Sequence, residues 1–371
     1  MHSRHALAFI CACLGLLALA TFLVAGRTSV VAHSAAANEP SLSPANGLPV
    51  RPAMSCRDSY VPVSLGPGLP ETERIFARLC LPRGGAPRAV QVLVHGWSYD
   101  HTYWDIPDPS RGSARYSYVS AAIRAGYATL AYDRLGDGAS SHPMSVAFTF
   151  DTGVWVAHQI VQAVRTKKIE GPAGPASFDK IVEVGHSYGS WYTWFEASRY
   201  HDVDAVILSS VTHRLNIPAT GIRAALDAQP ATLGPRFAGY LTTRPGRRYN
   251  AFYATAPVDP KVLAHDEATK QTGTASELAA IPEILATPLD IRVPVFIAMG
   301  SVDGLFCGAL GTDCSSREAF LAPERSALGP HVPSVDGFLL PNAGHDLNAM
   351  LNATAWFGAA QRWASVKVPP R

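Results

Sequence analysis

Six short, strongly apolar runs constrain the fold of this chain more than any other feature of its sequence. They are rich in β-branched residues, and their hydrophobicity is nearly continuous rather than alternating. Such runs are typical of strands that are buried on both faces of a parallel sheet. In chain order they are AVQVLV (89–94), YATLAY (127–132), KIVEVG (180–185), AVILSS (205–210), VPVFIAMG (293–300) and GFLLP (337–341).

Helix-like segments separate several of these runs. Periodicity alone does not distinguish a short buried strand from a piece of buried helix, so the alternation is what favours strands. Strands that alternate with helices predict a doubly wound α/β sheet. The helix-like segments are 116–125, 152–165, 188–199 and 347–363, and an earlier pair of alternating segments, 60–65 and 74–82, flanks a turn and predicts an antiparallel hairpin.

The alternation breaks once, between Ser210 and Val293. This interval holds helix-like pieces with Pro and Gly punctuation, and none of it reads convincingly as a strand. An excursion of this length inside a compact sheet is rarely a bare loop. We therefore expect a small, mainly helical cap at 211–290, inserted into an α/β core formed by 58–210 and 291–371.

The N-terminus has the pattern of an export signal. Arg4 and His5 precede an uncharged apolar run over 6–26, and small residues follow it. We expect a signal peptide over 1–37 and then a flexible linker over 38–57, and hence a secreted or extracytoplasmic protein. The apolar run is also long enough to span a bilayer, so an uncleaved membrane anchor is the alternative.

Four cysteines follow this leader, and an even number in an exported chain predicts disulfides. Four cysteines allow three pairings. The close spacing of Cys307 and Cys314 favours a local bridge, which leaves Cys56 to pair with Cys80. A metal site is the alternative, but neither a CxxC spacing nor a nearby pair of histidines supports one, so no metal is predicted.

The overall charge argues against a nucleic-acid partner. Net charge is +2 with a pI near 8.2, and no run of Lys or Arg forms the concentrated basic stretch that nucleic acid requires. Hydrophobic residues make up 47% of the chain and charged residues 16%, which indicates a sizeable folded core. Nothing in the composition indicates an oligomeric state.

The stretch GHSYG places Ser187 between Gly185 and Gly189, directly after the run KIVEVG and before a helix-like segment. In a tight strand-to-helix turn, the positions two before and two after the serine approach the backbone closely, so glycine fits there. Such a turn presents the hydroxyl above the carboxyl end of the sheet. We therefore predict that Ser187 is a nucleophile; the alternative is an ordinary glycine-rich turn.

A serine nucleophile needs a histidine base and an acid that orients it. Asp303 follows the run VPVFIAMG, and His345 follows the run GFLLP, so both belong to loops at the carboxyl edge of the sheet. We predict that Asp303 is the acid and His345 the base. The rival acids are Asp133, Asp313, Asp336 and Glu324, and the rival bases are His95, His186 and His213.

Acyl transfer also needs N–H donors for the oxyanion that forms in the reaction. The backbone N–H of Tyr188, directly after the serine, is one predicted donor. The second is expected in the loop after an earlier strand, where AVQVLV ends in His95-Gly96-Trp97. We assign it to the N–H of Trp97, with Ser98 as the alternative.

Taken together, these motifs resemble those of the α/β-hydrolase superfamily. The resemblance covers about 60–363 and rests on HGW, DRLGDGAS, GHSYG, GSVD and AGHD in this order. It implies an α/β-hydrolase fold with a mostly parallel eight-stranded sheet, a variable cap between the sixth and seventh strands, and no cofactor. A serine at the nucleophile position argues against the dehalogenases and epoxide hydrolases of this fold, which use Asp.

The function hypothesis is a serine esterase that cleaves a small-molecule carboxylic ester through an acyl-enzyme. Amide, lactone or peptide cleavage by the same three residues is an alternative. A non-catalytic binding protein on the same fold is another, although such proteins usually lose one of the three residues. We expect a membrane partner only if the leader stays uncleaved.

Overall fold

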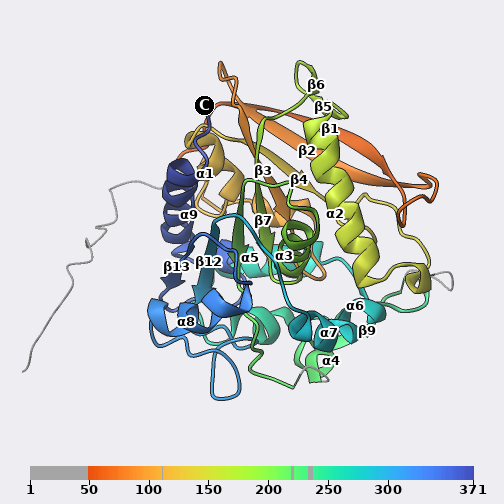
Figure 1. The fold of residues 1–371 in the computed structure, drawn as a ribbon. Helices are drawn as coiled ribbons and strands as arrows, with labels where there is room; N and C mark the ends of the chain where they lie inside the picture. Colours follow the sequence, from red (N-terminus) through yellow and green to blue (C-terminus); the bar gives the residue numbers. More distant parts are fainter. Residues whose placement is uncertain (1–48, 111, 219–220, 233–236) are drawn as a thin grey trace, which may run out of the picture. The chain divides into compact units, whose positions relative to one another are not determined.

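The computed structural model describes residues 49–371, except 111, 219–220 and 233–236 (Figure 1). The predicted signal peptide or anchor over 1–37 therefore lies outside the described residues, as does most of the predicted linker over 38–57. The end of that linker is part of the fold, because strand β1 already begins at Met54. No helix among the described residues has the length and apolar character needed to cross a membrane.

An eight-stranded sheet forms the centre of the fold, in the order β1-β2-β4-β3-β7-β8-β12-β13. The six apolar runs become its six mutually parallel strands, and β1 and β2 form the predicted antiparallel hairpin at one edge. The predicted fold class is thus confirmed. The strands are β1 (Met54–Val63), β2 (Glu73–Pro82), β3 (Ala89–Val94), β4 (Ala128–Tyr132), β7 (Lys180–His186), β8 (Ala205–Ser209), β12 (Val295–Gly300) and β13 (Val335–Leu340).

Helices pack in pairs along this sheet (Figure 1). Helix α1 (Tyr118–Arg124) lies beside α9 (Ala353–Lys367), and α2 (Phe150–Arg165) lies beside α3 (Tyr188–Tyr200). Helix α8 (Arg317–Ala327), which packs on β13, was not predicted. Short elements complete the core: η1 (His101–Trp104), η2 (Ser145–Ala147), β5 (Ile169–Gly171), β6 (Gly174–Ala176) and η6 (Leu347–Ala349).

The sequence predicts a mainly helical cap without a convincing strand between β8 and β12, but the structure contains strands in this segment. Its three short strands form a separate antiparallel sheet, in the order β11-β10-β9. These strands have two to four residues, too few for an alternating pattern to show. The insertion contains α4 (Ile222–Ala225), β9 (Ala228–Pro230), β10 (Tyr240–Thr243), the π-helix η5 (Tyr249–Tyr253), α5 (Pro260–Thr269), β11 (Gly273–Thr274), α6 (Ala275–Ala279) and α7 (Ile281–Ala286).

Buried polar contacts join this insertion to the core. Glu277 of the insertion lies 3.2 Å from the guanidinium of Arg134 in the loop after β4 and accepts a 2.9 Å hydrogen bond from the Tyr192 hydroxyl of α3. In the other direction, Arg248 of the insertion donates to the Ser98 hydroxyl at 3.0 Å. All five side chains are buried, so the two parts share one continuous interior.

Both disulfides have the pairing expected from the sequence. Cys56 and Cys80 bridge opposite positions on the neighbouring strands β1 and β2. Cys307 and Cys314 close the loop that follows β12.

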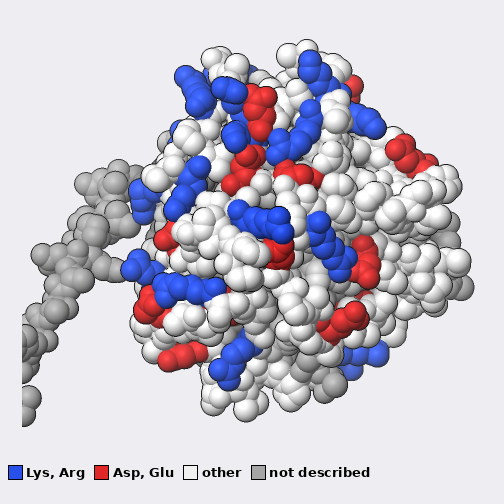
Figure 2. All heavy atoms as spheres, in the orientation of Figure 1, with Lys and Arg blue, Asp and Glu red and all other residues white. Residues whose placement is uncertain are grey.

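Charges of both signs are interspersed on the surface that Figure 2 shows. Several exposed arginines have a carboxylate partner, such as Arg88 with Asp179 and Arg325 with Glu318. Exposed pairs of this kind contribute little to stability. This face therefore carries no broad field of a single sign.

Candidate active site

Ser187 stands at the sharp turn between β7 and α3. Its backbone has a φ of 52° and a ψ of −120°, a region that residues other than glycine rarely occupy. Strain of this kind is stored where the surrounding structure holds a side chain in one position. Here it holds the Ser187 side chain beyond the end of a buried strand and at the beginning of a helix.

The two glycines of GHSYG are required by close backbone packing. A Cβ atom on Gly185 would lie 2.6 Å from the backbone nitrogen of Ser190, and one on Gly189 would lie 2.8 Å from the carbonyl carbon of Val94. Neither neighbour is a flexible side-chain end, so the backbone itself would have to move. This packing explains why small residues flank the serine at both positions.

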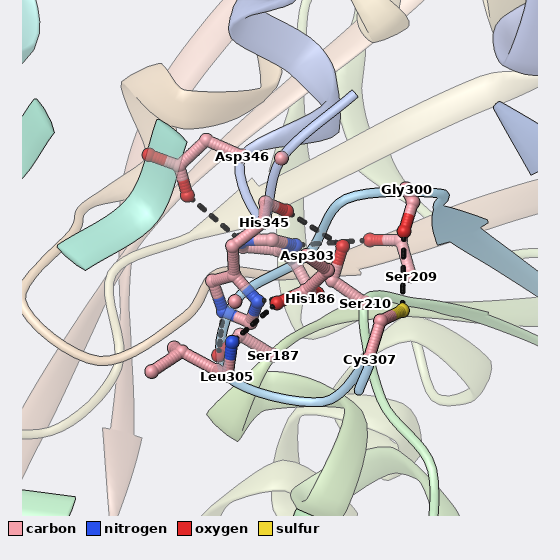
Figure 3. Close-up of polar contacts among 12 residues, drawn as sticks. His186, Ser187, Ser209, Ser210, Gly300, Asp303, Leu305, Cys307, His345 and Asp346 are labelled. Carbon is pink, nitrogen blue, oxygen red and sulfur yellow. Dashed lines mark hydrogen bonds and ion pairs between the residues drawn. The ribbon is translucent and has the colours of Figure 1, made fainter. Parts of the chain in front are cut away.

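Three side chains from distant parts of the sequence meet at this turn (Figure 3). Asp303 follows β12 and His345 follows β13, and these strands are parallel neighbours. The Nε2 atom of His345 lies 2.7 Å from the Oγ atom of Ser187, and its Nδ1 atom lies 2.9 Å from an oxygen of Asp303. The structure therefore brings together the three residues that the sequence selects as nucleophile, base and acid.

The electrostatic setting of His345 favours a proton on its ring. Burial disfavours the charged imidazolium, but the charge and hydrogen bond of Asp303 outweigh burial and raise the pKa of His345 above its ordinary value. His345 and Asp303 are buried, whereas Ser187 stays partly exposed. The arrangement can accept a proton from the Ser187 hydroxyl while leaving that hydroxyl open to a second molecule.

The loop after β3 packs directly against the serine turn. A Cβ atom on Gly96 would lie 3.2 Å from the Cβ atom of Ser187, which shows how closely the two loops approach. Trp97 follows, and then Ser98 with a positive φ of 63°. Tyr188 is the first residue of α3, where backbone N–H groups lack helical carbonyl partners. The assignment of the N–H groups of Trp97 and Tyr188 to an oxyanion stays a prediction.

The rival acids and bases have other partners. Asp133 lies 2.6 Å from the Nδ1 atom of His101, and Glu324 lies 2.7 Å from the Nδ1 atom of His213. His95 accepts a backbone N–H from the same loop as Asp133. Burial and the nearby charge of an arginine in that loop lower the pKa of His95 to about 3, so it stays neutral. These groups stabilise loops around the site.

The sequence matches the profile of the Alpha/beta hydrolase family over residues 91–360, well over half of the chain. The chain belongs to this family. A search of curated proteins finds no match.

Solved structures of other α/β hydrolases share the fold at low sequence identity. An alpha/beta hydrolase fold protein from Chitinophaga pinensis is 15% identical with a TM-score of 0.52, over 83% of this chain and 97% of that one. An esterase from Thermogutta terrifontis is 16% identical with a TM-score of 0.51, over 84% and 98%. A bromoperoxidase from Bacillus anthracis is 17% identical with a TM-score of 0.51, over 84% and 100%. At these identities the similarity concerns the fold alone.

A second carboxylate in the site of this α/β hydrolase was not singled out from the sequence. Asp346 accepts a short hydrogen bond from the Tyr99 hydroxyl, and its other oxygen lies 3.3 Å from the Nε2 atom of His186. Burial raises the pKa of Asp346 to about 6, although the charges of His345 and Arg248 oppose the rise. Asp346 thus links the residue before Ser187 to the loop after Trp97, as Figure 3 shows in part.

The only sign of this link in the sequence is adjacency. Asp346 directly follows His345, and His186 directly precedes Ser187. No spacing rule says that these two neighbours of the predicted catalytic residues meet, so only the fold could reveal the contact.

A cleft of 380 Å³ opens between α2, α3 and helices α6 and α7. Phe150, Phe195 and Ile284 supply part of its apolar lining, but Ser187 is not among the residues that line it. We therefore do not assign this cleft to the substrate of the serine site.

Proposed function

We propose that this α/β hydrolase is a serine esterase that cleaves carboxylic esters through an acyl-enzyme on Ser187. The observation that carries the proposal is the continuous chain of short contacts from Ser187 through His345 to Asp303, at 2.7 Å and 2.9 Å. A hydroxyl, an imidazole and a carboxylate in this order are what nucleophilic attack by serine requires.

In the first half-reaction, the Oγ atom of Ser187 attacks the carbonyl carbon of the ester while its proton passes to the Nε2 atom of His345. Asp303 orients the ring and stabilises the imidazolium that forms, in keeping with the raised pKa of His345. The backbone N–H groups of Trp97 and Tyr188 stabilise the oxyanion. When the carbon–oxygen bond to the alcohol breaks, the alcohol leaves with the proton from His345.

In the second half-reaction, water attacks the acyl carbon and gives a proton to His345. The bond to Ser187 breaks, the carboxylic acid leaves, and the proton returns to the serine oxygen. The residues named carry out every proton transfer, so the proposed reaction requires no cofactor.

We also propose that the protein acts outside the cytoplasm. Two disulfides support this, because such bonds persist in oxidising compartments. The apolar leader of the sequence points the same way.

Labelling with a fluorophosphonate probe tests the serine chemistry. We expect one covalent adduct per chain, located at Ser187 by mass spectrometry, and none in the Ser187→Ala variant. A folded wild-type protein that takes up no probe would contradict the proposal and favour a binding protein on the same fold.

The substrate class needs a separate measurement. A panel of p-nitrophenyl esters of increasing acyl length, run beside anilides and lactones, compares kcat/KM across the alternatives. We expect turnover of at least one ester to exceed that of every amide and lactone tested. Faster cleavage of an anilide or a lactone would still agree with Ser187 as the nucleophile but would contradict esters as the substrate class.

A further inference from the structure

A second cluster of polar side chains lies near the other end of α3 from Ser187. Glu196 projects from the last turns of that helix, and Asp202 follows it. His158 comes from the neighbouring helix α2, and Glu183 comes from strand β7 beneath them, four residues before the serine (Figure 1). Three separate elements of the core therefore contribute to one cluster, which we call the β7–α3 acidic cluster.

Acceptors outnumber donors within this cluster. The Nδ1 atom of His158 lies 3.3 Å from an oxygen of Glu196 and 3.1 Å from an oxygen of Asp202. Gln162 donates to the same oxygen of Asp202 at 2.5 Å. One further oxygen on each of these two carboxyls is buried, and its only donor would be a proton shared between the two carboxyls.

Glu183 adds an independent observation. Its side chain is completely buried, and neither carboxyl oxygen has a hydrogen-bond donor. Its acidic neighbours are the carboxyls of Glu196 and Asp202. The carboxyls of Glu183 and Glu196 can form a hydrogen bond with each other only if one of them carries a proton. A fully buried carboxyl that faces other carboxyls is costly unless something positive lies between them.

The basic side chains nearby do not supply that positive charge. Arg165 donates to the main-chain oxygen of Asp202 and to the carboxylate of Asp204. Arg199 pairs with Asp151. Within the part of the chain that the structure describes, no Lys or Arg forms an ion pair with Glu183, Glu196 or Asp202, and His158 is the basic group that contacts Glu196 and Asp202.

We propose that the β7–α3 acidic cluster is a binding site for a divalent cation of the zinc class, with His158, Glu196 and Asp202 as ligands and Glu183 as a buried carboxyl behind them. Imidazole nitrogen with carboxylate oxygens is a ligand set that suits zinc. Ligands about 2.1 Å from a tetrahedral ion stand about 3.4 Å apart, close to the two separations measured from His158.

Among the described residues, one other group has three such ligands close together. It differs from the β7–α3 acidic cluster because backbone N–H groups donate to its buried carboxylate. Asp133, next to His101 and Asp100, already accepts backbone N–H groups from His101 and Ala139. Its charge is therefore compensated without an ion. The β7–α3 acidic cluster has no such backbone donors to Glu183.

A bound ion would join helix α2 to helix α3 and to the residues that follow α3. We expect it to stabilise the fold rather than take part in the reaction, because the cluster lies along β7 and α3 away from the hydroxyl of Ser187. The inference does not depend on the proposed esterase activity, since its test measures binding and unfolding.

Isothermal titration of the chelator-stripped full chain with zinc chloride near neutral pH tests the site. We expect one ion per chain and a rise in the thermal unfolding temperature on loading. Binding should release protons, because the carboxyls and His158 must be deprotonated to act as ligands. Titration in two buffers of different ionisation enthalpy measures that release.

Two variants test the site, one at the ligand His158 and one at Glu183, the buried carboxyl behind the ligands. Glu183→Gln keeps the shape of the side chain, and His158→Ala removes the nitrogen ligand; we expect each to weaken zinc binding by at least about tenfold. Glu183→Gln should also release fewer protons per ion. Glu196→Gln serves as the replacement if His158→Ala does not fold.

His331→Ala is the matched control, because His331 is an exposed histidine that pairs with a carboxylate, Asp290, on the surface. It should bind zinc as the wild type does. Absence of stoichiometric binding to the wild type would overturn the proposal. Binding that Glu183→Gln leaves unchanged, or that His331→Ala abolishes, would also overturn it.

Discussion

The two ends of helix α3 hold histidine and carboxylate groups in different proportions. At the first end, His345 contacts one carboxylate, Asp303, and one hydroxyl, Ser187, each within 2.9 Å. At the other end, His158 contacts the carboxyls of Glu196 and Asp202, and the buried carboxyl of Glu183 in the same cluster has no hydrogen-bond donor. One helix therefore begins at a balanced set of donors and acceptors and ends at an unbalanced one.

This difference shows that the ratio of hydrogen-bond donors to acceptors decides what a buried polar group can do. Where each donor has one acceptor, a proton can move along the row without leaving a charge unpaired. Where acceptors are in excess, the group is stable only with added protons or a cation. The same residue types thus favour proton transfer in one place and ion binding in the other.

The largest expected effect is on kcat and comes from removing the charge of Asp303, the acid at the balanced end. Asp303→Asn keeps the size of the side chain but removes the charge that orients His345 and stabilises its protonated form. We expect kcat for an ester substrate to fall by about 10⁴-fold, measured under saturating substrate.

Asp133→Asn is the control for this change, because Asp133 is the rival acid of the sequence and bonds His101 instead. The folded control should keep most of its kcat. If Asp133→Asn lost as much activity as Asp303→Asn, the assignment of Asp303 as the acid that orients His345 would be contradicted.

A second change tests the packing on which that end depends. Gly189→Ala adds a Cβ atom against the backbone of Val94, and we expect it to lower the free energy of unfolding by about 3 kcal/mol. Gly358→Ala in α9 meets only the flexible end of Arg362 and should instead raise it by about 0.5–1 kcal/mol. Urea unfolding of both variants checks the pair, and equal effects would argue against the close packing.

Asp346 is a further carboxyl near the balanced end, and it makes a pH-dependent contribution to stability. Its pKa in the folded protein is raised from 3.8 to about 6, so folding binds its proton more tightly. This contribution is complete below 3.8 and is lost as the pH rises through about 6. The loss amounts to about 3 kcal/mol for two pKa units.

Asp346→Asn resembles the protonated carboxyl and does not titrate. The stability of the wild type relative to this variant should therefore fall between about pH 4 and about pH 6 and then level off, as measured by urea unfolding at a series of pH values. A difference that stays constant with pH would show that Asp346 does not titrate in this range.

The smallest expected effect is the position of the acid limb of the pH–rate profile. His345 must be neutral to act as a base, and its pKa is raised above 6.5 by Asp303 in spite of burial. The kcat/KM of the wild type should therefore fall as the pH drops, with a midpoint above 6.5. In Asp303→Asn the midpoint should move lower, whereas a wild-type midpoint below 6.5 would contradict the role of Asp303.

The fold was largely predictable because its central strands are a local property of the sequence. Each apolar run becomes a parallel strand. The five residues GHSYG indicate both the tight turn at Ser187 and the close backbone packing around it. Asp303 and His345 could be selected because each directly follows such a run.

The parts that the sequence did not predict depend on contacts between distant residues or on very short elements. Strands β9, β10 and β11 have too few residues to show a period, and α8 contains Pro323, which obscures a helix. The link from Asp346 to Tyr99 spans 247 residues, and that from His158 to Glu196 spans 38. Neither leaves a spacing pattern.

The crossed contacts of the insertion with the core have a consequence for engineering. Arg134 of the core pairs with Glu277 of the insertion as well as with Asp137, and Arg248 of the insertion reaches Ser98 of the core. A chimera that transplants another family member's insertion without an acidic residue at this place would remove one of the two carboxylates that pair with the buried guanidinium of Arg134. Successful grafts will need to carry an acidic residue at the equivalent of Glu277, or replace Arg134 by a neutral side chain at the same time.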